Sequence, residues 1–189
     1  MIEFIKNYVE KQAAAIRKSP YALLEDFCRE LLRARDGEHS IFFAGNGGSA
    51  ATASHFTNDL VKGLSPGNPR RFRAFSLVDQ VPVITALAND YDYSVIFQEQ
   101  LKNYARKGDL LVVISGSGNS PNIVKACEYA REHGVRTVGL TGRDGGKLRE
   151  LCDLTVIAPV DGMEEIEDIH MLWEHCVICT LKKEISSEV

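Results

Sequence analysis

The chain has 189 residues, of which 44% are hydrophobic and 25% charged, and its formal net charge is -4. This length suits one domain of ordinary size, and the lack of a basic stripe argues against nucleic acid as the main partner. No apolar run approaches the ~20 residues that cross a membrane. The amphipathic N-terminus, with Glu3 and Glu10, is unlike a secretory signal, so we expect a cytoplasmic protein with no membrane contact.

The five cysteines are odd in number and scattered along the chain. They are Cys28, Cys127, Cys152, Cys176 and Cys179. Reduced core thiols of a cytoplasmic protein explain this pattern best. Cys176-x-x-Cys179 could be a redox pair, but it lies within a helical pattern without the usual preceding turn, so we favour the core interpretation.

The predicted elements begin with two helices within residues 1–36, separated near Ser19-Pro20. The second helix has one strongly apolar face, because its large apolar residues recur at spacings of three and four. These residues are Leu23, Leu24, Phe27, Leu31 and Leu32. Strands are then predicted at 40–44, 73–77, 109–115, 135–141 and 154–158, with helices at 49–62, 82–88, 92–106, 120–133 and 145–151. Residues 162–184 read as one long closing helix.

The alternation of strands and helices predicts an α/β fold with a doubly wound, five-stranded parallel sheet. The strand segments LLVVIS and TVGLT are apolar on both faces, as strands of a sheet covered on both sides should be. We expect a single domain over residues 1–189, with two N-terminal helices and a long C-terminal helix.

The first predicted strand ends in a turn with three glycines, Gly45-Asn46-Gly47-Gly48-Ser49. Glycines let a backbone approach a ligand closely, and the N–H groups at a helix start favour an anion. The helix that follows carries His55 and Asp59 at i and i+4, on one face. This segment therefore combines an anion cradle with a candidate acid/base or metal pair.

A second loop of this type, Ser115-Gly116-Ser117-Gly118-Asn119-Ser120, follows the third strand. Serine hydroxyls and backbone N–H groups gathered around one small volume suit the oxygens of a phosphate monoester. A flexible loop is the alternative, which the position between an apolar strand and a helix start makes less attractive. The segment has neither the lysine of a P-loop nor the glycine spacing of a dinucleotide site.

Several segments together resemble the sugar isomerase (SIS) domain and, within it, the phosphoheptose isomerase family. They are AGNGGSA, His55-Phe56, ALAND, ISGSGNS and LTGRDGGKL, and the resemblance extends over about residues 1–183. It implies a flavodoxin-like strand order. It also implies that the serine loop holds the phosphate of a sugar phosphate, while the first loop contacts the sugar chain.

The resemblance implies the substrate-binding residues one by one. They are Asn46, Gly47, Gly48, Ser49, Asp90, Ser115, Gly116, Ser117, Ser120 and Glu167. Gly116 replaces a hydroxyl residue that is frequent in the family, and Ala88 replaces the glycine of the family's G-N-D segment before Asp90.

The family's H-F-x-x-E falls on His55 and Asp59, and its Q-x7-H falls on Glu167 and His175. The resemblance implies Asp59 as the base and His175 as the paired acid/base of an aldose-ketose isomerisation through an ene-diol. Aspartate here replaces glutamate and is one methylene shorter, but it can still act as a base. Glutamate replaces glutamine at position 167 and adds a negative charge.

The same four side chains, His55, Asp59, Glu167 and His175, are expected to form a zinc site, one per subunit. Whether the metal is catalytic or structural stays open. His170 and Asp168 compete for a place in it, because Glu167-x-x-His170 has the i, i+3 spacing of carboxylate metal bundles. We expect these two residues instead to support the site or to contact another subunit.

The resemblance implies a homotetramer that converts sedoheptulose 7-phosphate to D-glycero-D-manno-heptose 7-phosphate, an early step towards nucleotide-activated heptose. Residues 1–36 are expected to make oligomer contacts. One alternative is a non-catalytic SIS protein that binds a replication initiator, but such a protein has no need of His55, Asp59 and His175. Another alternative is an isomerase of a different sugar phosphate.

Overall fold

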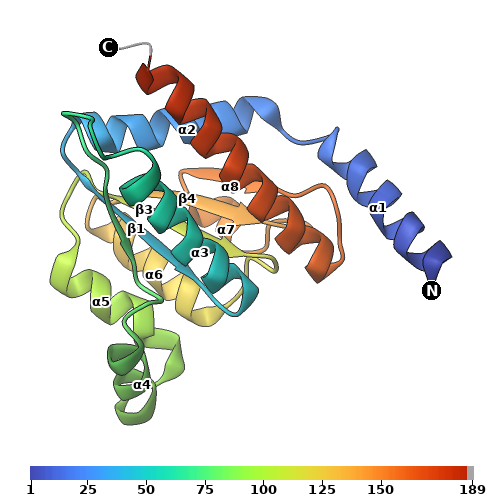
Figure 1. Ribbon diagram of the computed structural model, residues 1–189. Coiled ribbons are helices and arrows are strands. Elements are labelled where there is room, and N and C mark those ends of the chain that lie inside the picture. The colour runs from blue at the N-terminus through green and yellow to red at the C-terminus, as the bar shows by residue number, and fades with distance from the viewer. Residues whose placement is uncertain (187–189) are drawn as a thin grey trace.

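A computed structural model describes residues 1–186, which form a five-stranded, all-parallel sheet with the strand order β2-β1-β3-β4-β5 (Figure 1). This order confirms the predicted doubly wound, flavodoxin-like sheet. The strands are β1 (Ser40–Gly45), β2 (Arg73–Ser76), β3 (Leu110–Ser115), β4 (Arg136–Thr141) and β5 (Leu154–Ile157).

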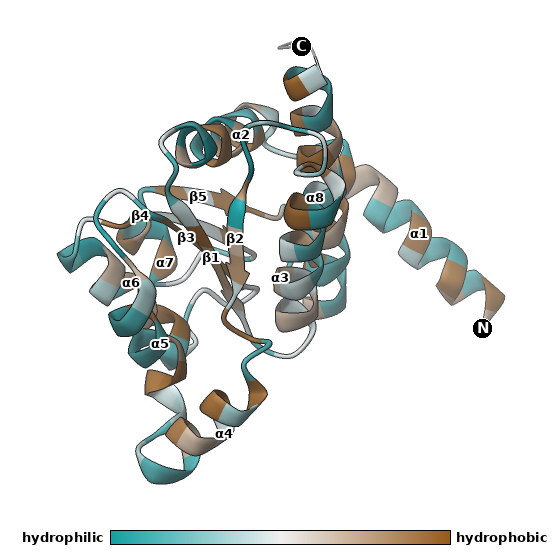
Figure 2. Ribbon diagram, turned by 60° about the vertical axis from the view of Figure 1, so that its left-hand side comes forward, coloured by the Kyte–Doolittle hydropathy of each residue, from teal (hydrophilic) through white to brown (hydrophobic). Residues whose placement is uncertain are grey.

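Helices cover both faces of the sheet, as Figure 2 shows. The N-terminal helices are α1 (Ile2–Ile16) and α2 (Tyr21–Asp36), and α3 (Gly48–Asn58) continues into a π-helical turn, Asp59–Gly63. The remaining helices are α4 (Val81–Asp90), a 3-10 turn (Tyr93–Val95), α5 (Ile96–Tyr104), α6 (Pro121–Glu132), α7 (Leu148–Leu151) and α8 (Met163–Ser186). Across residues 1–186, every helix is too short or too polar to span a bilayer.

Alternate residues of the central strands serve two separate cores. Ile41 and Phe43 of β1 face a core shared with α2, α3 and α8, whereas Phe42 faces a core shared with α5, α6 and α7. Because successive side chains of a strand point to opposite faces, one apolar strand can supply both cores. The run of apolar residues in β1 and β3 is thus accounted for by burial on both sides.

Several predicted helices differ from the observed ones at their ends; the one predicted at 92–106 begins as a 3-10 turn, Tyr93–Val95, and is α-helical only over Ile96–Tyr104. The predicted helix at 49–62 changes to π-helical geometry at Asp59, and the one predicted from residue 145 starts only at Leu148. The late start at Leu148 has a simple cause, because Gly145 and Gly146 have φ angles of 87° and 54°. These left-handed conformations cannot belong to a right-handed helix.

The cysteine prediction is correct only in part. Cys28 and Cys127 are buried and all five thiols are free, but Cys176 and Cys179 are exposed. The core interpretation of the Cys176-x-x-Cys179 pair is therefore wrong. Apolar neighbours on α8 suggested burial, yet a surface helix buries only one face, and these residues lie outside it.

Helix α1 extends away from the body of the domain (Figure 1) and is anchored through the first turns of α8. The Tyr8 hydroxyl donates to Asp168 Oδ2 at 2.6 Å, and Gln12 Nε2 donates to the same oxygen at 3.1 Å. Asp168 therefore supports α1 of its own chain. This position leaves Asp168 outside the group of candidate metal ligands described below.

His170 and Trp173 fix α8 against the rest of the fold. The Trp173 indole donates to Ser19 Oγ at 2.8 Å, in the turn between α1 and α2. His170 is fully buried, and its Nε2 lies 2.9 Å from the Thr141 carbonyl oxygen, so this nitrogen carries the proton. His170 thus holds α8 to the end of β4.

Burial of the neutral ring makes His170 a source of acid sensitivity. Burial lowers the pKa of His170 to about 4, although the hydrogen bond to Thr141 opposes the shift. The unfolded chain takes up this proton near pH 6.5, so the stabilising contribution is complete above that pH and is lost as the pH falls towards 4. The difference in unfolding free energy between these limits should be roughly 3 kcal/mol.

We therefore expect His170→Gln, which keeps a donor for Thr141 but does not titrate, to flatten the pH dependence of stability between pH 6.5 and 4. Urea unfolding at a series of pH values measures this slope. His133→Gln, at an exposed histidine, is the matched control and should behave like the unsubstituted protein. An unchanged slope in His170→Gln would contradict the assignment.

Candidate active site

The first loop and the serine loop meet at the carboxyl edge of the sheet, because β1 and β3 are neighbours in register from Ile41–Leu110 to Gly45–Ile114. Such an edge is where ligands bind in open α/β sheets. A cavity of about 150 Å³ lies between the loops and the start of α8. It is lined by Asn46, Ser49, Ile114, Ser115, Gly116, Ser117, Ser120, Met163 and Glu167.

The serine loop is held in shape by the turn after β4. Gly118 has a φ of 63°, and its N–H donates to the Ser115 carbonyl oxygen at 2.9 Å. A β-carbon on Gly118 would overlap the backbone of Gly145, so the two turns are in direct contact. Asn119 Oδ1 also accepts from the Lys147 N–H at 3.1 Å. The GRDGGK segment, residues 142–147, therefore packs against the serine loop and holds it in shape.

Asn46 is fixed by two residues that the sequence did not single out. Its amide exchanges two hydrogen bonds with the Asn122 amide, at 2.9 and 2.8 Å, and its Oδ1 accepts from the Tyr93 hydroxyl at 3.0 Å. Asn122 belongs to α6 and is 1% exposed, so the pair is rigid on one side. Asn46 is thereby held in a fixed orientation in the lining of the cavity.

Glu167 lies in this cavity and not with the histidines. Its carboxylate is so close to Gly48 that a β-carbon at position 48 would overlap it. It is the sole carboxylate among the residues that line the cavity. Its expected place in the substrate pocket agrees with this position, but its expected place in the metal set does not.

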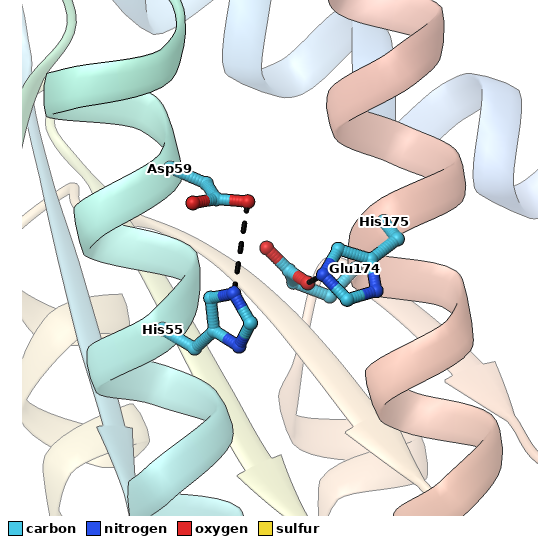
Figure 3. A group of neighbouring side chains, drawn as sticks. All are labelled: His55, Asp59, Glu174 and His175. Atoms are coloured by element: carbon cyan, nitrogen blue, oxygen red, sulfur yellow. Dashed lines mark ion pairs between the residues drawn. The ribbon is translucent and has the colours of Figure 1, made fainter.

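A second group of side chains lies between α3 and α8, which run side by side (Figure 3). It consists of His55, Asp59, Glu174 and His175, whose ligand atoms all lie within 4.8 Å of one another. His55 Nε2 is 3.8 Å from Asp59 Oδ2, and the two imidazole centroids are 5.0 Å apart. The structure therefore brings together three of the four predicted metal ligands, with Glu174 in place of Glu167.

The four side chains converge because of their positions on α3, the π-helical turn and α8. His55 is near the end of α3, and Asp59 opens the π-helical turn that follows it. Glu174 and His175 are consecutive on α8 and therefore ~100° apart around its axis. Glu174 consequently points into the contact between the helices, whereas His175 reaches the group from the exposed flank.

Glu174 is fully buried, and neither carboxylate oxygen receives a hydrogen bond from any described residue. Burial raises the pKa of Glu174 to about 7; the nearby His55 lowers it, and the Asp59 carboxylate raises it further. A buried carboxylate without donors is costly unless a cation or a proton neutralises it. With two imidazoles and a second carboxylate beside it, the group has the donors that a divalent zinc-type ion requires.

Sequence reasoning missed Glu174, although a signal was present. Glu174 follows Glu167 by seven residues, which places both on the same face of α8, two turns apart. The Q-x7-H motif of the family, by contrast, falls on Glu167 and His175.

The predicted substrate residue Asp90 lies elsewhere. It is exposed at the end of α4 and accepts a hydrogen bond from Asn89 at 2.8 Å. It does not line the cavity between the two loops. Helix α4 has no buried residue of its own and projects from the body (Figure 1), which accounts for this position.

A larger hollow of about 560 Å³ lies along the edge strand β2. Its residues include Phe75, Asp79 and Gln100, but neither of the Gly/Ser-rich loops and none of the four clustered side chains. It therefore includes neither the serine loop nor the clustered histidines and carboxylates, and the smaller cavity is the better candidate site.

The SIS domain family matches residues 3–142 of the chain. The phosphoheptose isomerase of Aliarcobacter butzleri is 42% identical over 148 residues, 78% of each chain, and that of Akkermansia muciniphila is 37% identical over 190 residues, 98% of each chain. The solved structure of a phosphoheptose isomerase from Francisella tularensis has a TM-score of 0.90 at 28% identity, and the match covers 96% of this chain and 98% of that one. The chain therefore belongs to the phosphoheptose isomerase family of SIS-domain proteins.

Proposed function

We propose that the protein is an aldose-ketose isomerase that converts sedoheptulose 7-phosphate to D-glycero-D-manno-heptose 7-phosphate, early in the synthesis of nucleotide-activated heptose. One observation carries the proposal. A cavity with a serine loop and a cluster of histidines and carboxylates lie along the same helix pair, α3 and α8. Family membership and the activity named for the relatives support it.

The distance between the cavity and the cluster of histidines and carboxylates favours a long sugar phosphate. Glu167 at the cavity and Glu174 at the cluster are seven residues apart on one helix face, so ~10 Å separates them along the axis. A phosphate held by the serine loop would leave a chain of several carbon atoms to span this distance. The carbonyl end would then lie beside the cluster, where the acid/base groups are.

In this arrangement the hydroxyls of Ser115, Ser117 and Ser120, with the backbone at Gly116, hold the phosphate. Asn46, Ser49 and Glu167, together with the backbone of Gly47 and Gly48, contact the sugar hydroxyls. Asp90 contributes to the site only if the loop after α4 belongs to another subunit's site, because in its own chain it lies away from the cavity.

The chemistry needs two proton transfers. Asp59 removes the proton from the carbon next to the carbonyl, which gives an ene-diol, and a proton is then delivered to the neighbouring carbon. His175 moves the proton between the two oxygens. Its side chain is 53% exposed, so a substrate can reach it from the open flank of α8.

We propose that His55, Asp59 and His175 hold one zinc ion per subunit, with the fourth ligand considered below. A bound zinc ion polarises a carbonyl oxygen as a Lewis acid. The donor set fits such an ion, since it combines two imidazoles with carboxylate oxygens.

We also propose that the protein is a homotetramer in the cytoplasm and that residues 1–36 form contacts between its subunits. Helix α1 supports it, because it projects from the body and exposes a row of large apolar side chains. They are Ile2, Phe4, Ile5 and Val9. Exposed apolar surface of this kind marks an interaction site.

Asp59→Asn and His175→Ala should each reduce turnover of sedoheptulose 7-phosphate by at least about 100-fold, because each removes a proton-transfer group. Proton NMR of the sugar, which resolves the new aldose signal, measures the rate. Asp26→Asn, at a half-buried position, and His133→Ala, at an exposed one, are matched controls and should retain normal turnover. Normal rates in both site variants would refute these roles, and no aldose signal with the unsubstituted protein would favour a binding function or another sugar.

Gly48→Ala should raise the KM for the sugar phosphate by about tenfold, because a β-carbon there displaces the Glu167 carboxylate. The melting temperature should not fall, since alanine suits a helix better than glycine and the displaced atoms end a flexible side chain. Gly63→Ala is the matched control, because its β-carbon would meet no atom within 4 Å. An unchanged KM in Gly48→Ala would mean that the position of Glu167 does not affect binding.

A further inference from the structure

The Glu174 side chain is the least satisfied polar group of the α3–α8 contact. It is fully buried, yet both of its oxygens lack a hydrogen-bond donor among residues 1–186. Leaving a buried carboxylate in this state costs folding free energy, since its solvation by water is lost without replacement. A residue with such a cost needs a partner that compensates for it.

The groups that face Glu174 offer no permanent positive charge. They are the Asp59 carboxylate and the two imidazoles, with His175 Nε2 at 3.3 Å from Glu174 Oε2. No lysine or arginine forms an ion pair with Asp59 or Glu174 in the described part of the chain. One Asp59 oxygen accepts a hydrogen bond from Asn58 at 2.9 Å, which leaves the other oxygen to face the group.

A proton or a metal ion could compensate for the two carboxylates. A proton shared between Asp59 and Glu174 would neutralise one charge, but it would leave the imidazole nitrogens without a function in the group. A divalent cation would neutralise both carboxylates and accept a lone pair from all four side chains. The convergence of four ligand atoms within 4.8 Å favours the cation.

We propose that Glu174 is the fourth protein ligand of a divalent zinc-type cation, together with His55, Asp59 and His175. Glu167, two helical turns earlier, is then free to contact the sugar. The assignment deepens the proposed function by giving its metal site a complete ligand set, two nitrogens and two carboxylates. It also implies that the site is electrically neutral when a divalent ion is bound to neutral imidazoles.

The ligand role predicts that replacing Glu174 changes stability in opposite directions with and without metal. Without metal the buried carboxylate destabilises the fold, so Glu174→Leu should melt at a higher temperature than the unsubstituted protein in the presence of chelator. With excess zinc the unsubstituted protein gains stability from binding, and the variant should gain less or none.

The binding test uses cobalt(II) as a coloured probe for the zinc site, added to the full-length protein after chelator treatment. We expect one cobalt ion per chain, and a decrease in affinity of about 10- to 100-fold in Glu174→Gln. Glu167→Gln removes the same charge from the same helix face and should bind cobalt like the unsubstituted protein. Titrations followed by visible absorption and calorimetry give both affinities.

Two outcomes of the cobalt titrations would overturn the proposal: cobalt affinity unchanged in Glu174→Gln, or a fall in affinity in Glu167→Gln equal to or greater than that in Glu174→Gln. A lower melting temperature of Glu174→Leu in chelator would also contradict it, because it would show that the carboxyl group stabilises the metal-free fold. Turnover is not part of these readouts. The ligand assignment can therefore hold for a protein that does not isomerise sedoheptulose 7-phosphate. Equally, the protein can isomerise this sugar even if Glu174 is not a ligand.

Discussion

Helices α3 and α8 pack side by side on one face of the sheet, and the rest of the site depends on this contact. At their first turns the contact is so close that a β-carbon at position 48 would displace the Glu167 carboxylate. Further along, the same pair encloses Glu174 between His55 and Asp59. Side chains from distant parts of the sequence thus form both the cavity and the cluster of histidines and carboxylates along one pair of helices. The carboxyl edge of the sheet supplies the serine loop beside the cavity.

The contact is held from outside the site as well. Trp173 is bonded to the turn between α1 and α2, and His170 to the end of β4, so α8 is fixed on both sides. Because these contacts stabilise α8, the helix can tolerate the buried Glu174 carboxylate, which has no hydrogen-bond donor among the described residues. Functional sites commonly accept a local loss of stability of this kind when the surrounding structure compensates for it.

The fold could be predicted from the sequence because its signals are local. Apolar runs such as LLVVIS mark strands buried on both faces, and the Gly/Ser-rich turns after them mark the carboxyl edge of the sheet. The site could be predicted only where a residue matched a motif. Glu174 has no such motif, and its role depends on which flank of α8 faces α3, a matter of helix packing and not of spacing alone. For the same reason the apolar sequence around Cys176 suggested burial although that flank is exposed.

The π-helical turn at Asp59–Gly63 adds an evolutionary consequence. A single π turn within a helix has the form of a one-residue insertion, and such turns are frequent at functional sites. The turn begins at Asp59, directly after α3, which carries His55. A deletion of one residue between positions 60 and 63 would remove the extra residue of the turn, and it would rotate the following segment relative to α8. Natural selection would therefore have to preserve the length of this short stretch as well as its buried residue, Leu60.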